Sequence, residues 1–200
     1  MLDLKKIAIT GGIASGKSTV CRILKDHGVS TLSSDKVIHQ LLEEHPSCIE
    51  QVISLLGAQV ITDHKIDRKK VANIVFNDEE KLKALEALLH PLLLKRIDEE
   101  YKTVAEEGKK DYFVVELPLV QEIGKTKDFD LIVAVVSDDD KALKRFTQAG
   151  FTEETFHKRN ARQWDPEKKA KYADFVIENR GTVEELKENV LELIKEIHSQ

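Results

Sequence analysis

Residues 11–18 read GGIASGKS, and this stretch constrains the fold more than any other part of the chain. Its spacing, a glycine, four residues and then Gly-Lys-Ser, is the phosphate-binding loop pattern. The apolar run KKIAIT at 5–10 comes directly before it, and apolar residues at helical spacing follow it. A short run that is apolar on both faces predicts a buried parallel strand. A strand, a glycine-rich turn and a helix in this order predict an α/β sheet protein.

The residue types in this loop suit a bound polyphosphate. Glycines let the backbone turn tightly and point its amides at an anion, and the following helix adds the positive end of its dipole. Lys17 is placed to reach the β- and γ-phosphates, and the Ser18 hydroxyl is a candidate Mg²⁺ ligand. By resemblance to such loops, Thr19 adds a hydroxyl near the α-phosphate. The residues predicted to contact a nucleoside triphosphate are Gly11, Gly12, Ile13, Ala14, Ser15, Gly16, Lys17, Ser18 and Thr19.

Nucleotide binding does not by itself identify the reaction. A switch GTPase needs a DxxG element and an NKxD guanine reader, but no Asp in the chain has Gly three residues later and no Asn precedes Lys. A phosphotransferase instead needs a second pocket for the acceptor and a means of excluding water. The helical stretch between the second and third predicted strands is the candidate acceptor region, and the basic segment 141–171 is the candidate lid. These features indicate a nucleoside- or nucleotide-kinase-like enzyme.

The charge of the chain is distributed unevenly. The net charge of the 200 residues is −5, but segment 141–171 holds nine basic and four acidic residues, hence +5, which leaves −10 for the rest. An acidic chain argues against a general nucleic-acid binder. A local basic stretch within it favours a small polyanion. We therefore expect small-molecule substrates, no nucleic acid and no obligate protein partner.

Composition sets further limits. A hydrophobic content of 41% excludes general disorder, and 200 residues suggest one domain or one domain with an insertion. The longest apolar run, 131–136, is too short for a transmembrane helix, and no signal-peptide pattern fits. Cys21 and Cys48 make no disulfide framework, and the seven histidines show no zinc spacing. We expect a cytoplasmic protein with no membrane association.

Periodicity predicts five strands separated by helices. The predicted strands are short apolar or β-branched runs at 5–10, 29–33, 112–117, 131–136 and 174–178. Region 36–110 has helical spacing, and Pro91 predicts a kink or break near His90. Capping boxes are expected at Asn77 with Glu80 and at Thr182 with Glu185.

These elements predict an α/β, P-loop kinase-like fold. A parallel sheet of about five strands is flanked by helices, with a helical insertion that binds the acceptor and a helical lid. The predicted nucleotide-binding core comprises residues 1–35, 111–140 and 172–200. The insertion is expected at 36–110 and the lid at 141–171.

Motifs beyond the loop resemble those of the dephospho-coenzyme A kinase family over nearly the whole chain, from Ile7 to about Val190. The opening TGGIASGKST resembles the family loop TGGIGSGKS, with Ala14 in place of a glycine. The other matching elements are, in chain order, Asp35, Asp67-Arg68, Val75-Phe76, Leu85-Glu86, His90-Pro91, Glu116-Leu117-Pro118-Leu119 with Glu122, Arg145, Arg159, Gln163, Lys169, Ala173-Asp174 and Asn179-Arg180-Gly181. Their common order is more specific than the loop alone.

The resemblance implies ATP-dependent phosphorylation of the ribose 3′-hydroxyl of dephospho-coenzyme A, with Mg²⁺, giving coenzyme A and ADP in the last step of coenzyme A synthesis. An attacking alcohol loses a proton, and a carboxylate within reach is the expected acceptor. Asp35 is that candidate, because it lies just past the second strand, at the edge where open α/β sheets bind ligands. The residues that the resemblance assigns to the acceptor are Asp35, Arg68, His90, Glu116, Pro118 and Arg159. Those that it adds to the ATP site are Arg145, Asn179 and Gly181, and the catalytic candidates are Lys17, Asp35 and Arg145.

Three positions depart from the family pattern, and several assignments leave a structural alternative open. Ser33 removes one of two acids, Glu116 replaces an aspartate, and segment 148–150 lacks an arginine that the family usually places there. The structural alternatives are a helix cap for Asp35, a structural acid for Glu116, a helix end for His90, packing for Trp164 and a solvated helix start for Asp138–Asp140. Two other functions also stay open. One is a kinase for another small alcohol or nucleotide, and the other is a nucleotide-dependent binding protein without catalysis.

Overall fold

The computed structural model describes residues 4–199, which form two compact units. The sheet unit comprises residues 4–33 and 103–199, and the helical unit comprises residues 34–102. All five strands of the main sheet and the glycine-rich loop belong to the sheet unit.

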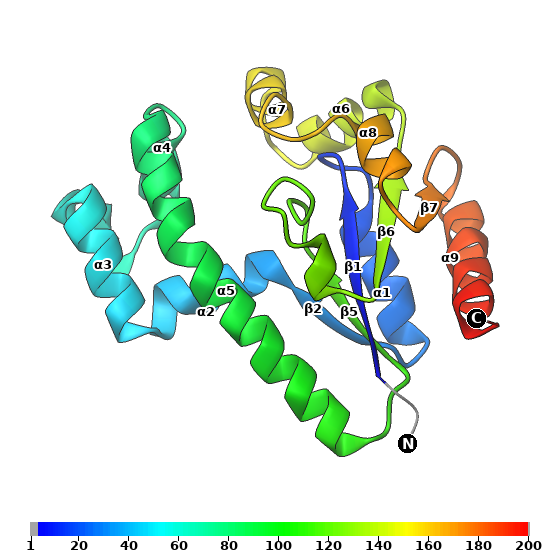
Figure 1. Ribbon diagram of the computed structural model, residues 1–200. Helices are drawn as coiled ribbons and strands as arrows, with labels where there is room; N and C mark the ends of the chain where they lie inside the picture. Colours follow the sequence, from blue (N-terminus) through cyan, green and yellow to red (C-terminus); the bar gives the residue numbers. More distant parts are fainter. Residues whose placement is uncertain (1–3, 200) are drawn as a thin grey trace. The chain divides into compact units, whose positions relative to one another are not determined.

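A five-stranded parallel sheet forms the centre of the sheet unit (Figure 1). Its strands are β1 (Lys5–Gly11), β2 (Ser30–Ser33), β5 (Tyr112–Glu116), β6 (Leu131–Val136) and β7 (Phe175–Glu178). They lie in the order β2-β5-β1-β6-β7, and every neighbouring pair is parallel. β1 and β6 are buried along almost their whole length, as expected of strands that are covered on both faces. The prediction of about five parallel strands flanked by helices is confirmed.

Helices α1 (Lys17–Asp26) and α9 (Val183–His198) pack on one face of this sheet. Apolar side chains of both helices join alternate residues of the strands in one core cluster. The predicted capping box of α9 is confirmed, because the Thr182 hydroxyl accepts from the Glu185 N–H and the Glu185 carboxylate accepts from the Thr182 N–H. Each large apolar side chain fully buried in this way stabilises the fold by about 1.5–3 kcal/mol.

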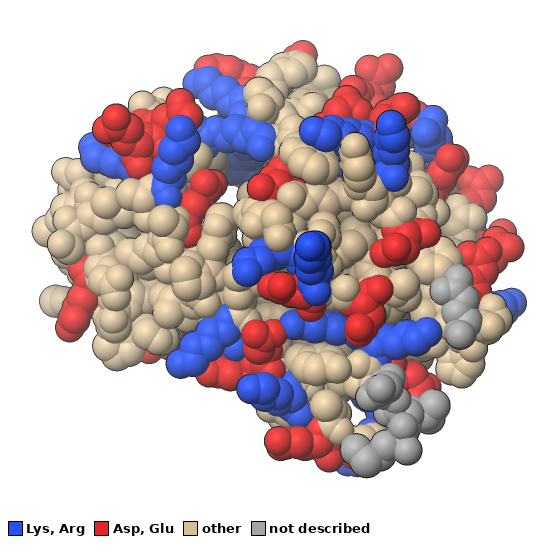
Figure 2. Space-filling model, in the orientation of Figure 1, with Lys and Arg blue, Asp and Glu red and all other residues tan. Residues whose placement is uncertain are grey.

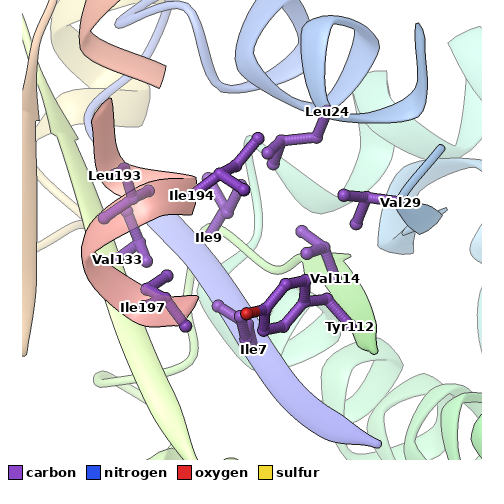
Figure 3. Close-up of a pocket in the computed structure, with 10 residues that line it drawn as sticks. All are labelled: Ile7, Ile9, Leu24, Val29, Tyr112, Val114, Val133, Leu193, Ile194 and Ile197. Atoms are coloured by element: carbon purple, nitrogen blue, oxygen red, sulfur yellow. The ribbon is translucent and has the colours of Figure 1, made fainter. Parts of the chain in front are cut away.

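A small apolar cavity lies inside this core (Figure 3). The side chains that line it are Ile7, Ile9, Leu24, Val29, Tyr112, Val114, Val133, Leu193, Ile194 and Ile197. Its volume of about 20 Å³ is close to the space that one water molecule needs, and all its lining residues except Tyr112 are aliphatic. The cavity is therefore a packing gap and not a ligand site.

The segment predicted as helical and polar at 141–171 folds into three helices. They are α6 (Asp139–Gln148), α7 (Glu153–Asn160) and α8 (Pro166–Lys171). Helix α8 lies against β1 and β6. Its Lys169 reaches Thr10, whose side chain points away from the face that α1 and α9 cover, so α8 covers the opposite face. A short 3₁₀ helix, η2 (Thr126–Asp128), precedes β6.

The helical unit contains helices α2 (Ser34–Glu44), α3 (Pro46–Leu56), η1 (Ala58–Val60) and α4 (Arg68–Val75), and most of α5 (Glu79–Glu107). It also contains a two-stranded antiparallel hairpin, β3 (Ile61–Thr62) with β4 (Lys65–Ile66), within region 36–110, where only helical spacing was predicted. Asp63 and His64 form the turn with φ angles of 48° and 62°. Two positive φ angles match a type I′ turn, which usually carries Asn-Gly, so its sequence signal was missing. Within residues 4–199, no helix combines the length and the apolar character needed to cross a membrane.

A kink or a break was expected near His90, and the break is wrong, because α5 continues through Pro91 as one helix. Proline removes one backbone donor, but Leu85, Leu89, Leu93 and Ile97 form one buried row on both sides of it. The burial of this row holds the helix together across the lost hydrogen bond. The capping box expected at Asn77 with Glu80 is also wrong, since the carboxylate of the neighbouring residue, Asp78, accepts the N–H of Lys81 at 3.0 Å.

Candidate active site

The glycine-rich loop connects β1 to α1 at the carboxyl edge of the sheet. Gly11 has φ 143°, and a Cβ there would lie 2.2 Å from the carbonyl oxygen of Val135. Gly16 has φ 105°, and a Cβ there would lie 2.2 Å from Nδ2 of Asn179. Only glycine fits both positions. Ala14, which stands where the family pattern has glycine, adopts φ 50°, at a cost of about 1–2 kcal/mol.

Lys17 reaches back across the loop from the first turn of α1. Its Nζ donates to the carbonyl oxygens of Gly11 at 3.0 Å and Gly12 at 2.6 Å, and the side chain is buried. These contacts hold an ammonium group at the loop, beside backbone amides and a helix N-terminus. This concentration of positive charge suits the phosphates of a nucleotide.

The Ser18 hydroxyl contacts a buried carboxylate. Its Oγ donates to Oε1 of Glu116 at 2.6 Å, and Glu116 is 8% exposed. Glu116 ends β5 opposite Ile9 of β1, which brings it to the edge of the sheet where the loop begins. Two hard oxygen donors side by side fit Mg²⁺, which binds one or two protein oxygens together with phosphates and water. Residues 4–199 contain no group of three or more His, Cys, Asp or Glu that would hold a metal without a nucleotide.

Asn179 links the loop to α6. It directly follows β7, is 5% exposed, and donates from Nδ2 to the carbonyl oxygen of Ser15 at 2.7 Å. Arg145 of α6 donates to Asn179 Oδ1 at 3.4 Å and to Ser137 Oγ at 3.0 Å. Both residues were predicted to contact ATP. The structure brings them together at the loop, with the Asn179 side chain on the loop backbone.

Helices α6 and α7 pack onto the tip of the loop through an aromatic cluster. Phe146 and Phe156 form its buried centre, and Ile13 and Ala14 of the loop pack against it. The guanidinium of Arg159 lies over the ring of Phe146 at 5.8 Å and over that of Phe151 at 5.2 Å. Such contacts of a cation with aromatic rings hold the guanidinium in place.

Part of the basic excess of segment 141–171 is neutralised locally. Lys141 pairs with Asp138 at 2.9 Å, and Lys158 pairs with Glu154 at 2.8 Å. Asp138 is the N-cap residue of α6, which agrees with the predicted solvated helix start. Figure 2 shows acidic and basic side chains mixed over the face that it draws.

A lysine–glutamate pair with a fully buried lysine lies close to the loop. Both residues match elements of the family pattern, but the sequence did not predict that they pair. Lys169 of α8 is 0% exposed, and its Nζ lies 2.8 Å from Oε1 of Glu122. It also donates to the carbonyl oxygen of Pro118 and lies 3.5 Å from the hydroxyl of Thr10. Burial lowers the pKa of Lys169, and Glu122 opposes this shift. A lysine within a run of charged residues looks solvated in the sequence, so only the folded chain reveals this pair.

The remaining predicted acceptor residues are divided between the two units. Asp35 is exposed in the first turn of α2, Arg68 is exposed at the start of α4, and His90 is half-buried inside α5, so it does not end that helix. These three lie in the helical unit. Pro118 lies in the sheet unit, as do Glu116 and Arg159.

An open cavity of about 570 Å³ lies beside the loop in the sheet unit. The residues that line it are Ser137, Asp138, Asp139, Asp165, Pro166, Glu167 and Arg180. Pro166 adjoins Gly12 of the loop, since a Cβ on Gly12 would lie 3.2 Å from it. Arg180 lies between the predicted ATP residues Asn179 and Gly181, the latter being exposed.

Comparison with known proteins points to one family over nearly the whole chain. The sequence model of the family described as dephospho-CoA kinase matches residues 5–185. The dephospho-CoA kinase of Chlamydia felis is 42% identical over 193 residues, which cover 96% of each chain. A crystal structure of the protein TT1252 from Thermus thermophilus superposes with a TM-score of 0.81 at 29% identity, and it covers 96% of this chain and 97% of its own. The dephospho-CoA kinase from Campylobacter jejuni superposes with a TM-score of 0.65 at 31% identity and the same two coverages.

Proposed function

The chain belongs to the dephospho-CoA kinase family and is a kinase that acts on dephospho-CoA, and we propose that it transfers the γ-phosphoryl group of ATP to the ribose 3′-hydroxyl of that acceptor. The products are coenzyme A and ADP. The observation that carries the proposal is the position of Lys17, whose ammonium group lies at the glycine-rich loop and donates to the carbonyl oxygens of Gly11 and Gly12.

The loop binds the phosphates of ATP, and its positive groups stabilise the charge of the transferred phosphoryl group. Lys17 exchanges its contacts with the carbonyls of Gly11 and Gly12 for phosphate oxygens. Arg145, held by Ser137 and Asn179 beside the loop, adds a second positive charge. The open cavity lined by Pro166 and Arg180 takes the adenosine end of the nucleotide, because it adjoins the loop.

Ser18 and Glu116 hold Mg²⁺ when the nucleotide is bound. The proposal rests on the 2.6 Å contact of their oxygens and on the burial of the carboxylate. A bound Mg²⁺ neutralises part of the charge of the β- and γ-phosphates. The contact with Ser18 favours this role for Glu116 over direct acceptor binding.

Asp35 accepts the proton of the 3′-hydroxyl group as its oxygen attacks the γ-phosphorus. The new bond joins that oxygen to phosphorus, the bond between phosphorus and the β,γ-bridging oxygen breaks, and ADP leaves. Arg68, His90, Pro118 and Arg159 are proposed to bind the acceptor, whose phosphates suit the two arginines. The region 36–110 then serves as the acceptor domain and 141–171 as the lid.

The test measures ADP and phosphorylated product with ATP and a panel of acceptors. We expect turnover with dephospho-coenzyme A and none with shikimate or nucleoside monophosphates, which would otherwise indicate a kinase for another acceptor. Lys17→Met should lower kcat by at least about 10²-fold, whereas Lys25→Met, on the exposed side of the same helix, should not change it. Normal turnover by Lys17→Met would remove the loop from the mechanism.

A further inference from the structure

Lys169 and Glu122 connect three parts of the chain that surround the loop. Lys169 lies in the last turn of α8, and its Nζ contacts Thr10, the residue before Gly11. The same Nζ contacts the carbonyl oxygen of Pro118, two residues after Glu116. The Thr10 hydroxyl also donates to that carbonyl oxygen, at 2.8 Å. One ammonium group thus joins β1, the chain that follows β5, and α8.

Glu122 holds the other end of α8. Its Oε1 accepts the backbone N–H of Trp164 at 2.8 Å and the ammonium group of Lys169 at 2.8 Å. Trp164 precedes Asp165, the N-cap residue of α8. The side-chain amide of Gln121 adds a bond from its Nε2 to the carbonyl oxygen of Lys169 at 3.0 Å. The start and the end of α8 are therefore both fixed to residues 118–122.

We propose that Lys169 and Glu122 are positioning residues of the kinase, whose ion pair fixes the C-terminal end of the lid segment on the chain that follows Glu116. Arg159 lies five residues before Trp164, and Glu116 lies two before Pro118. The pair thereby sets the positions of both side chains relative to the loop. This inference rests on the proposed function of the loop, Glu116 and Arg159.

Stability alone is a weak explanation for such a pair. Removing two charges from water costs about as much as their attraction returns, so apolar or neutral residues of similar size often stabilise a fold equally well. The pair lies where three functional segments meet, and its hydrogen bonds to Trp164 N–H and Pro118 C=O have direction as well as strength. A role in positioning these segments accounts for both the location of the pair and the direction of its hydrogen bonds.

The test separates geometry from stability with a single and a double variant. Lys169→Met removes the ammonium group and leaves Glu122, whose side chain is 13% exposed, without its counter-ion, so Tm falls. In Lys169→Met/Glu122→Gln the site is neutral, and Gln still offers an acceptor to Trp164 N–H. We expect Tm of the double variant to return to within about 5 °C of the parent. We expect kcat to stay about 10²-fold low, because no donor replaces the one at Pro118 and Thr10.

Further readouts keep the result decisive. KM for ATP should change much less than kcat, since the loop itself remains intact. Backbone hydrogen exchange should rise in residues 117–122 and 161–165 of the double variant but not in α9. Lys171→Met, an exposed change in the same helix, is the matched control. If the double variant regains kcat together with Tm, the pair is only structural and the proposal is overturned.

The experiments would give a different set of results if the proposed function were wrong. A parent protein without turnover on dephospho-coenzyme A would refute that function, and hydrogen exchange would still test the positioning role. Unchanged exchange in residues 117–122 and 161–165 would refute the positioning role whatever the activity.

Discussion

Replacing Asn179 by Asp turns one buried side-chain amide into a carboxylate of almost the same size. In the parent, Nδ2 donates to the carbonyl oxygen of Ser15 at 2.7 Å, and the side chain is 5% exposed. The variant places two acceptor oxygens at that distance with no hydrogen between them. The loop backbone and the new carboxylate must then move apart, or the carboxyl group must take up a proton.

The magnitude follows from the loss of this buried bond. Leaving a buried acceptor without its donor costs about 1–3 kcal/mol. The new charge gains an attraction to Arg145, whose NH2 lies 3.4 Å from Oδ1, which offsets about 1 kcal/mol. We expect the free energy of unfolding to fall by up to about 2 kcal/mol, with about 1 kcal/mol as the middle of this range. The carboxylate also repels phosphates in the loop and neutralises Arg145, so KM for ATP should rise at least about tenfold, equivalent to about 1.4 kcal/mol.

The assay pairs urea unfolding with steady-state kinetics at varied ATP. Asn189→Asp is the matched control, because Asn189 Nδ2 makes the same kind of bond, at 3.0 Å to the carbonyl oxygen of Glu178, on the exposed surface of α9. The control should keep the parental KM and lose less than about 0.5 kcal/mol of stability. If Asn179→Asp keeps both its stability and its KM for ATP, the bond to Ser15 does not hold the loop, and the reasoning is wrong.

Two further predictions concern a carboxylate and a thiol. Asp35→Asn should lower phosphoryl transfer by roughly 10²–10⁴-fold, since an amide takes up no proton. The free energy of unfolding should stay within about 1 kcal/mol, because the exposed carboxylate in the first turn of α2 contributes only a helix-dipole interaction of about 0.3–1 kcal/mol. An active Asn variant would move the search for the base to other carboxylates. Burial, with the nearby Glu116 adding to it, raises the pKa of Cys21 to about 12 from 9.0. The folded protein therefore holds this proton between pH 9 and 12 while the unfolded chain releases it, so stability should fall as pH rises above 9, by up to about 1.4 kcal/mol per pH unit. Urea unfolding of the parent and of Cys21→Ala at pH 8 and 10 checks this, and an equal pH dependence in both would contradict it.

Local features of the sequence were sufficient for much of the fold. The strand, loop and helix of residues 5–26 are contiguous, and their apolar periodicity and glycines depend on nearest neighbours along the chain. The capping box at Thr182 is likewise a contact between residues three apart. The buried strands were recognisable because each is short, apolar and β-branched.

Some features were not recognisable from the sequence, because contacts elsewhere in the fold offset an unfavourable residue at that position. Pro91 signals a helix end, but a buried row of leucines on both sides of it carries the helix onward. The turn at Asp63 and His64 lacks the glycine that normally marks its backbone shape. In both places contacts with the surrounding fold offset an unfavourable local conformation. A prediction that considers only neighbouring residues in the sequence does not include those contacts.

The sequence by itself was enough to predict a nucleotide site at residues 11–18, because a phosphate site made of backbone amides is a local structure. Tertiary structure alone decided what supports that site. Glu116 reaches Ser18 across 98 residues of sequence, Asn179 reaches Ser15 across 164, and Lys169 reaches Thr10 across 159. The parallel sheet brings all these residues to its carboxyl edge, and burial there makes their polar contacts obligatory, since a buried charge or amide without a partner costs several kilocalories per mole.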